Sequence, residues 1–227
     1  APALKPIYEA VAWFTELPHQ EISALFRDHP PHLLAFFAAG LWCVPGLAYI
    51  TGFDQTATDI RSRHLRFLLL RVDRATLFAG RAVATLVVLS LSYLLAIALL
   101  AWLMTGVEGG VGGVAGFGYL ARIWLSLVLF TIPFVALLAW TNTLTGHPYM
   151  ALAVAVALQF GLWVTGLVGG WMDVPTVEMA QQLFPTAHKY KLLSDDFGLL
   201  RTALLHQLGL AAAFAALGWR SFRRRDV

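Results

Sequence analysis

Residues 82–105, AVATLVVLSLSYLLAIALLAWLMT, form a continuous apolar run that contains no Asp, Glu, Lys or Arg. An α-helix needs about 20 such residues to cross the hydrocarbon core of a bilayer, because each residue advances the helix by about 1.5 Å. The run is therefore long enough to form a transmembrane helix. A strand of a transmembrane barrel would instead show a weak alternation of apolar and polar residues over about ten positions.

Four further apolar runs of similar length occur along the chain. Only 13% of the 227 residues are charged and 59% are hydrophobic, whereas soluble domains carry roughly 25% charged residues. The mean hydropathy of +0.69 agrees with this contrast. The fold class predicted from the pattern is an all-α, polytopic transmembrane helical bundle with five visible spans. The other four spans are expected at about 33–53, 119–141, 149–168 and 199–219.

The segments between and before these spans divide the chain into two regions. Residues 1–30 are predicted to be an exterior or interfacial amphipathic segment, and 31–227 the transmembrane domain. The linker 169–198 is long enough to hold a short amphipathic helix at 175–184 that ends before a proline. We therefore expect an exterior helical hairpin there.

Arginine gathers in two short stretches, and these orient the predicted spans. Six of the 16 Lys and Arg residues lie in 58–81, and four more lie in 220–225. Because cytoplasmic loops carry an excess of Lys and Arg, both stretches and the C-terminus are predicted to be cytoplasmic. The polar turn 142–148 then lies inside and the glycine-rich loop 106–118 outside. Five spans leave the N-terminal end outside, so we expect a sixth span before it; the alternative is that 6–27 anchors in the interface.

Composition and motifs argue against several classes of function. The net charge of +3 and the pI near 9.3 reflect membrane topology and do not indicate nucleic-acid binding. No GxxxxGK[ST] motif occurs, so the chain is not expected to hydrolyse ATP by itself. The predicted spans contain no Asp or Glu and no HExxH motif, so we predict no catalytic residue, no metal site and no cofactor on this chain.

The stretch 54–81 is predicted to form a helix-turn-helix between two spans. Residues 59–70, DIRSRHLRFLLL, are expected to form one helix with Asp59 near its start and arginines later, as the helix dipole favours. A break is expected around 72–73. A topology signal needs only a few arginines near the span ends, whereas the apolar FLLL among them indicates a surface that a partner buries. We favour a docking surface, and a topology signal alone stays the alternative.

This stretch resembles the membrane subunits of ABC type-2 transporters, a permease family that includes bacterial exporters and copper-enzyme maturation permeases. The family pattern is an acidic residue after a span, an acidic-basic stretch, a leucine-rich run, a Pro-Val-x-Arg-like turn, and Gly-Lys at the next span. The chain departs from that pattern at Arg63-His64, where the family has Gly-Thr, and it lacks the turn proline. The positions that match are Asp54, Asp59, Leu65, 67–70, 72–74 and Gly80-Arg81.

The resemblance implies a transmembrane permease subunit of such a transporter, multi-pass in a bacterial inner membrane and assembled as a homodimer or heterodimer. ATP and Mg²⁺ would be bound by separate cytoplasmic ATPase subunits that dock on 54–81. The alternative is a non-transporting membrane scaffold that recruits a cytoplasmic partner through the same loop. The expected ATPase-coupling residues are Asp59, Arg61, Arg63, Arg66, Leu68, Leu69, Arg71, Asp73 and Arg74.

Three polar residues lie inside the predicted spans, namely Gln159, His206 and Gln207. Polar side chains are rare at such depths, and those that occur favour contacts between helices or a position along a polar cavity. We expect structural hydrogen bonds between helices, with an intramembrane polar path for a substrate as the alternative.

Overall fold

The structure is a computed structural model that describes residues 31–104, 113–172, 184–194 and 196–225. The predicted amphipathic segment 1–30 lies outside these residues. So does nearly all of the helix predicted at 175–184, which leaves the exterior hairpin a prediction.

The described chain is all-α, as the sequence predicted, and it has five helices long and apolar enough to cross a membrane. Each of them covers one of the five predicted spans. The architecture is therefore that of a multi-pass membrane protein. The long helices are α3 (Pro31–Gly52), α6 (Arg74–Met104), α7 (Gly113–Thr145), α8 (Pro148–Met172) and α10 (Phe197–Arg223).

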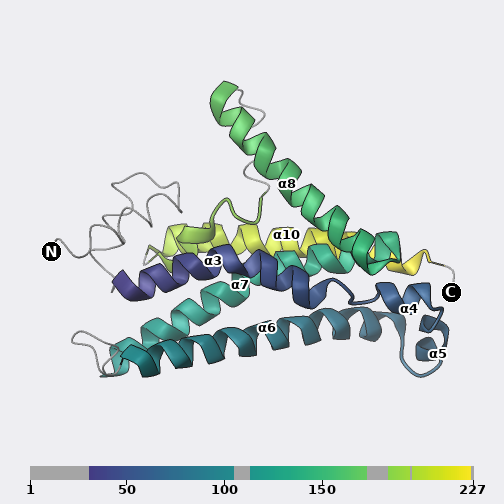
Figure 1. The fold of residues 1–227 in the computed structure, drawn as a ribbon, viewed down its shortest axis with the longest axis horizontal. Helices are drawn as coiled ribbons and strands as arrows, with labels where there is room; N and C mark the ends of the chain where they lie inside the picture. Colours follow the sequence, from purple (N-terminus) through teal and green to yellow (C-terminus); the bar gives the residue numbers. More distant parts are fainter. Residues whose placement is uncertain (1–30, 105–112, 173–183, 195, 226–227) are drawn as a thin grey trace.

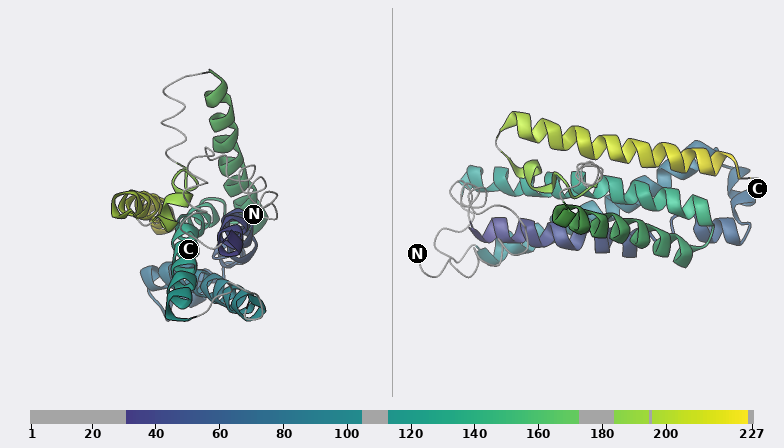
Figure 2. Two further views of the ribbon diagram at one scale, coloured as in Figure 1. Left: turned by 90° about the vertical axis from the view of Figure 1, so that its left-hand side faces the viewer. Right: turned by 90° about the horizontal axis from the view of Figure 1, so that it is seen from above.

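Helix α7 is the centre of the bundle. It contacts α3, α6, α8 and α10, as well as the short 3₁₀ helix η2 (Lys189–Leu193). Figures 1 and 2 show α3, α6 and α10 lying along it. Its core positions recur every three or four residues, the spacing that returns to one face of a helix. These fully buried positions are Ile123, Leu127, Phe130, Phe134 and Leu138.

Small residues allow the neighbouring helices to approach α7 closely. A Cβ added at Gly218 of α10 would lie 3.1 Å from the Cα of Trp140 and 3.2 Å from its backbone nitrogen. A Cβ at Gly40 of α3 would lie 3.0 Å from a methyl carbon of Leu127. Small residues at such crossings are how membrane helices gain van der Waals contact, because lipid tails are as apolar as leucine side chains.

Helix α8 leaves the bundle. It starts against α7 and also contacts the short helix α4 (Ala57–Arg61), but Figure 1 shows it diverging from the other long helices toward its C-terminal end. A hydrogen bond from the Tyr49 hydroxyl to the Gln159 side chain joins it to α3. Most of its apolar surface faces away from protein within the described chain.

Two predicted loops are shorter than expected. The stretch 142–148 was expected to be a polar turn, but α7 continues to Thr145 and only 146–147 form the turn. Its polar residues fit the helix because the side chains of Thr141 and Asn142 bond back to the carbonyl of Leu138. Gly146 then ends the helix with a φ of 65°, a conformation that glycine adopts without strain.

The glycine-rich stretch 106–118 was also expected to be a loop. Helix α7 already begins at Gly113 within it, so this prediction was wrong for residues 113–118. Glycine lowers helix propensity by only about 1 kcal/mol per residue. The apolar packing of α7 further along the helix, from the buried Leu120 and Ile123 onward, offsets that cost.

The two arginine-rich stretches lie at the same end of the bundle. Figure 1 places α4, the short helix α5 (Leu65–Leu69) and the C-terminus together there. The turn at 146–147 is at this end too, because Gly146 lies against Ile60 and Arg225. The loop 54–81, the turn before α8 and the end of α10 were predicted to lie on the same side of the membrane. The structure places all three at the same end of the bundle.

Candidate functional site: the charged loop between α3 and α6

The loop between α3 and α6 begins with an aspartate that starts helix α4. The Asp54 carboxylate accepts hydrogen bonds from the Thr58 backbone N–H, at 2.9 Å, and from the Thr58 hydroxyl, at 2.7 Å. A carboxylate beside the first turn satisfies backbone donors that the helix leaves unpaired and suits the helix dipole. Asp54 therefore fixes where α4 begins.

The predicted single helix 59–70 is two helices. Helix α4 ends at Arg61, and α5 begins at Leu65. Arg63 between them has a φ of 57°, a left-handed conformation that costs a non-glycine residue about 1–2 kcal/mol. The break lets Leu65 turn inward, where it is only 1% exposed. Burial of that side chain offsets the strain.

The predicted break around 72–73 is present, and Asp73 starts helix α6. Its carboxylate accepts from the Thr76 hydroxyl at 2.6 Å and from the Thr76 backbone N–H at 2.9 Å. These hydrogen bonds, with the hydroxyl bond first, lower the pKa of Asp73 below its usual value. Asp73, predicted as a coupling residue, acts here as the cap of the helix that follows the loop.

Asp59 and Arg81 tie the loop to the bundle. Arg81 of α6 forms an ion pair with the Asp59 carboxylate of α4, and its other terminal nitrogen donates to the Gln55 carbonyl at 2.8 Å. The Asp59 side chain is 16% exposed. One guanidinium thereby holds both the start of the loop and its first helix against α6.

Arginines also join α6, α7 and α10 at this end. Arg74, the first residue of α6, donates to the carbonyls of Arg223 and Arg225 at 3.3 and 3.1 Å. Arg225 in turn donates to the carbonyls of Thr143 and Leu144 at 2.7 and 2.6 Å. The last carbonyls of a helix have no partner within the helix and carry partial negative charge, so these guanidinium groups cap α10 and α7.

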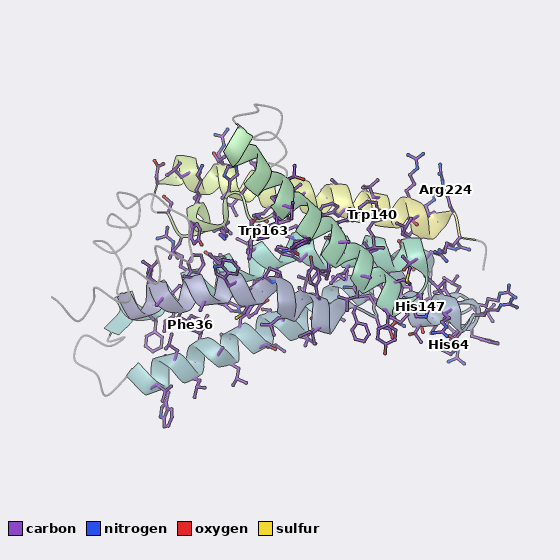
Figure 3. The ribbon with its side chains drawn as sticks, turned by 45° about the horizontal axis from the view of Figure 1, so that its top comes forward. Phe36, His64, Trp140, His147, Trp163 and Arg224 are labelled. Carbon is purple, nitrogen blue, oxygen red and sulfur yellow. The ribbon has the colours of Figure 1, made fainter. Side chains whose placement is uncertain are left out.

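Arg61 connects the loop with the turn between α7 and α8. Its guanidinium lies 3.0 Å from Nε2 of His147, and Figure 3 shows His147 at the same end of the bundle as His64. Gly146 beside it packs against Ile60 of α4. The loop therefore touches the turn between α7 and α8 at two residues.

The tip of the loop faces outward. Arg63, Arg66 and Arg71 are exposed and make no side-chain hydrogen bond or ion pair within the described residues. Between them Phe67 is 66% and Leu70 83% exposed, while Leu68 and Leu69 are half-buried. We define the loop tip as these five exposed residues and the exposed Val72 that follows them, that is, Arg63, Arg66, Phe67, Leu70, Arg71 and Val72.

The predicted coupling residues thus form two groups. Asp59, Asp73 and Arg74 bond within the chain, and Arg61 reaches His147. The arginines of the loop tip remain available, next to exposed apolar side chains. Such a surface has the charge and the apolar area that suit contact with an acidic partner.

The three predicted intramembrane polar residues do not form one path within the described structure. Gln159 of α8 bonds to Tyr49 of α3. On α10, Gln207 is fully buried and donates to the carbonyl of Pro185, and the ring of His206 lies 4.9 Å from that of His188. Gln159 therefore makes the expected bond between helices, and the other two contact the segment that precedes η2.

The His188–His206 pair lies near the opposite end of the molecule. Burial lowers the pKa of His188, and the charges of Lys191 and His206 lower it further.

Among the described residues, no group of three or more His, Cys, Asp or Glu side chains is arranged to hold a metal ion.

Sequence reasoning did not assign three residues of this site their structural roles. Asp73 could have been recognised, because Asp at the position before a helix is one of the favoured N-cap residues. Arg81 and Arg225 could not, because their partners lie 22 residues and about 80 residues away in the sequence.

No protein-family model matches this chain, and no curated protein matches it either. The resemblance to ABC type-2 permeases therefore remains a prediction based on the residues of 54–81.

Proposed function

We propose that this chain is the membrane-spanning permease subunit of an ABC type-2 transporter, with ATP hydrolysis on separate cytoplasmic subunits that bind the loop tip. The observation that carries the proposal is the loop tip itself. It presents three exposed arginines around exposed Phe67 and Leu70, on a loop whose base is bonded to the helices behind it.

The base of the loop suits the transmission of movement. An ATPase that moves the loop tip would pull on α6 through Asp59 and Arg81. It would also act on the turn before α8 through Arg61 and His147. A partner can change a membrane protein's conformation only by binding its two states with different affinity. Because the loop tip is joined to several helices, its position changes when they rearrange, and the partner can bind the two positions differently.

In this proposal the predicted coupling residues have different tasks. Arg63, Arg66 and Arg71 contact the ATPase directly. The apolar contact comes from the exposed Phe67 and Leu70, in place of the predicted Leu68 and Leu69, which are half-buried. Asp59, Asp73 and Arg74 position the loop, since their charges are used within the chain.

The test is purification of the tagged chain from its own membranes, followed by assay of vanadate-sensitive ATPase activity and identification of co-purified subunits. We expect a subunit with a P-loop. The double change Phe67→Asp and Leu70→Asp should remove that subunit and the activity, because buried apolar anchors dominate interfaces. Arg224→Glu is the control, since Arg224 is an exposed arginine at the same end but outside the loop tip.

A purified chain without a nucleotide-binding subunit and without ATPase activity would contradict the transporter assignment. A different partner that still requires Phe67 and Leu70 would favour the membrane scaffold instead. An ATPase subunit that remains bound to the double variant would show that the loop tip is not the docking surface.

A further inference from the structure

A pocket of about 350 Å³ lies between the ends of α3 and α6, behind the loop. Thr51, Asp54 and Gln55 line it from the α3 side, and Gly80, Arg81, Ala84 and Thr85 from α6. It therefore contains one cationic and one anionic side chain from neighbouring elements. None of the residues of the loop tip lines it.

The pocket has hydrogen-bonding capacity that the chain does not use. Arg81 gives one N–H of each terminal nitrogen to Gln55 and Asp59, but a guanidinium has five N–H donors. Asp54 accepts two bonds from Thr58, whereas a carboxylate can accept about four. Both groups are open to a ligand, since the Arg81 side chain is 35% exposed and Asp54 is exposed.

The pocket lies at the depth of lipid headgroups. Arg81 directly precedes the apolar run that starts at residue 82, so the guanidinium is at the boundary between the loop and the membrane-spanning part of α6. Below it, one face of α6 continues from Ala84 through Val87, Val88 and Leu91, all exposed. On α3, Leu47 one turn from Thr51 is exposed as well.

Small side chains keep the pocket open. Gly80 and Ala84 are one helical turn apart on α6, and a Cβ added at Gly80 would meet no atom within 4 Å. Larger residues at these two positions would fit the helix and occupy the space that a ligand needs.

We infer that this pocket binds the headgroup of a phospholipid that carries both a phosphate and a primary amine, as phosphatidylethanolamine does. The phosphate meets the N–H groups of Arg81 that Gln55 and Asp59 leave unused, because guanidinium groups are well suited to phosphate. The ammonium group meets Asp54. The acyl chains lie on the apolar faces of α6 and α3. A purely anionic headgroup would be repelled by Asp54 and by the Asp59 that pairs with Arg81, whereas the ammonium group of a zwitterion offsets that repulsion.

The inference goes beyond the proposed function and does not depend on it. It needs only that the five helices cross a membrane, and it concerns residues behind the loop tip. If the ATPase experiment fails, the lipid inference still stands. If the lipid experiment fails, the proposed transporter function still stands.

The experiment compares lipid retention by native mass spectrometry of the full chain after mild delipidation. The chain is reconstituted in turn with phosphatidylethanolamine, phosphatidylglycerol and phosphatidylcholine. We expect phosphatidylethanolamine to be retained best. Phosphatidylcholine should be retained about tenfold less, because its methylated amine cannot donate a charged hydrogen bond to Asp54.

The double variant Gly80→Leu with Ala84→Leu tests whether the lipid binds in this pocket. It fills the pocket and leaves Arg81 and Asp59 unchanged. Its control is Gly209→Leu with Ala213→Leu, an equally spaced pair on the exposed face of α10. The pocket-filled variant should lose the preference for phosphatidylethanolamine, and the control should keep it.

Three results would overturn the inference. Equal retention of the three lipids would show that the chain holds ordinary bilayer lipid without a preference for one headgroup. Stabilisation of the detergent-purified chain by soluble O-phosphoethanolamine or inorganic phosphate, without retention of lipid, would assign the site to a soluble phosphate compound. A change in oligomeric state of the pocket-filled variant, with lipid retention unchanged, would assign the pocket to a second copy of the chain.

Discussion

Helices α7 and α8 follow one another through a two-residue turn, yet their surroundings are opposite. In the most apolar 18-residue window, 67% of α7 is buried inside the described structure and 18% of α8. Both windows are apolar enough to cross a membrane, with mean hydropathies of 2.3 and 1.5. Hydropathy therefore indicates that a helix crosses a membrane and does not indicate whether protein or lipid surrounds it.

Buried polar residues separate the two helices better than hydropathy does. Helix α7 buries the hydroxyls of Ser126, Thr131, Thr141 and Thr143 and the amide of Asn142. These groups bond to nearby carbonyls or to neighbouring helices. Polar groups of this size are tolerated inside a membrane protein where other helices cover them. The sequence of α8 has few, and its Thr165 is exposed.

The largest expected difference between α7 and α8 is in the loss of stability when one phenylalanine ring is removed from each helix. Phe130→Ala on α7 deletes a fully buried side chain that stacks edge-on against Phe134 at 5.2 Å. It should lower the stability of the purified chain by about 3–5 kcal/mol, the usual cost of a phenylalanine cavity. Phe160→Ala on α8 removes a side chain that is 60% exposed and should change stability by about 0.5 kcal/mol or less. Unfolding in detergent, followed by fluorescence, measures both; equal effects would contradict the comparison.

The second effect tests the close approach of α10 to α7. Gly218→Leu would force a side chain against the backbone of Trp140 and should cost about 1–3 kcal/mol, the range for overpacking. Gly209→Leu is the control on the same helix, where an added Cβ meets nothing within 4 Å. It should be neutral or slightly stabilising, because leucine favours a helix more than glycine does. Thermal unfolding of the two variants decides; a stable Gly218→Leu chain would show that α10 does not pack there.

The third effect concerns how α7 ends before α8 begins. Arg225→Ala removes the guanidinium that caps the carbonyls of Thr143 and Leu144, and should cost about 1 kcal/mol. Arg224→Ala, an exposed neighbour, should cost almost nothing. Hydrogen exchange should become faster in the last turn of α7, and only in the Arg225 variant. Unaltered exchange there would show that the C-terminal arginine does not hold the helix end.

Much of the fold could be predicted from the sequence, because spans depend on local composition. All five helices and the joint placement of the arginine-rich stretches follow from runs of apolar residues and from charge. The break at Arg63 could not be predicted, because it depends on the burial of Leu65 in the folded chain. For the same reason the exposed arginines of the loop could not be separated from Asp59 and Arg74, whose partners lie on other elements.

The smallest effect lies at the other end of α7, where η2 packs against α7 and α10. His188 just before η2 faces His206 of α10, with Lys191 nearby, and its pKa is lowered from the usual 6.5. In the folded chain His188 therefore binds its proton at lower pH than in the unfolded chain. The unfolded state takes up more protons between the two pKa values, so the stability due to neutral His188 is complete above pH 6.5 and is lost as the pH falls through the folded pKa. Thermal unfolding between pH 7.5 and 5 should show this loss in the wild type and less of it in His188→Gln. His64→Gln, at the exposed loop, is the control and should follow the wild type. If His188→Gln instead kept the full pH dependence, the contact between η2 and α10 would not be the acid-sensitive part of the bundle.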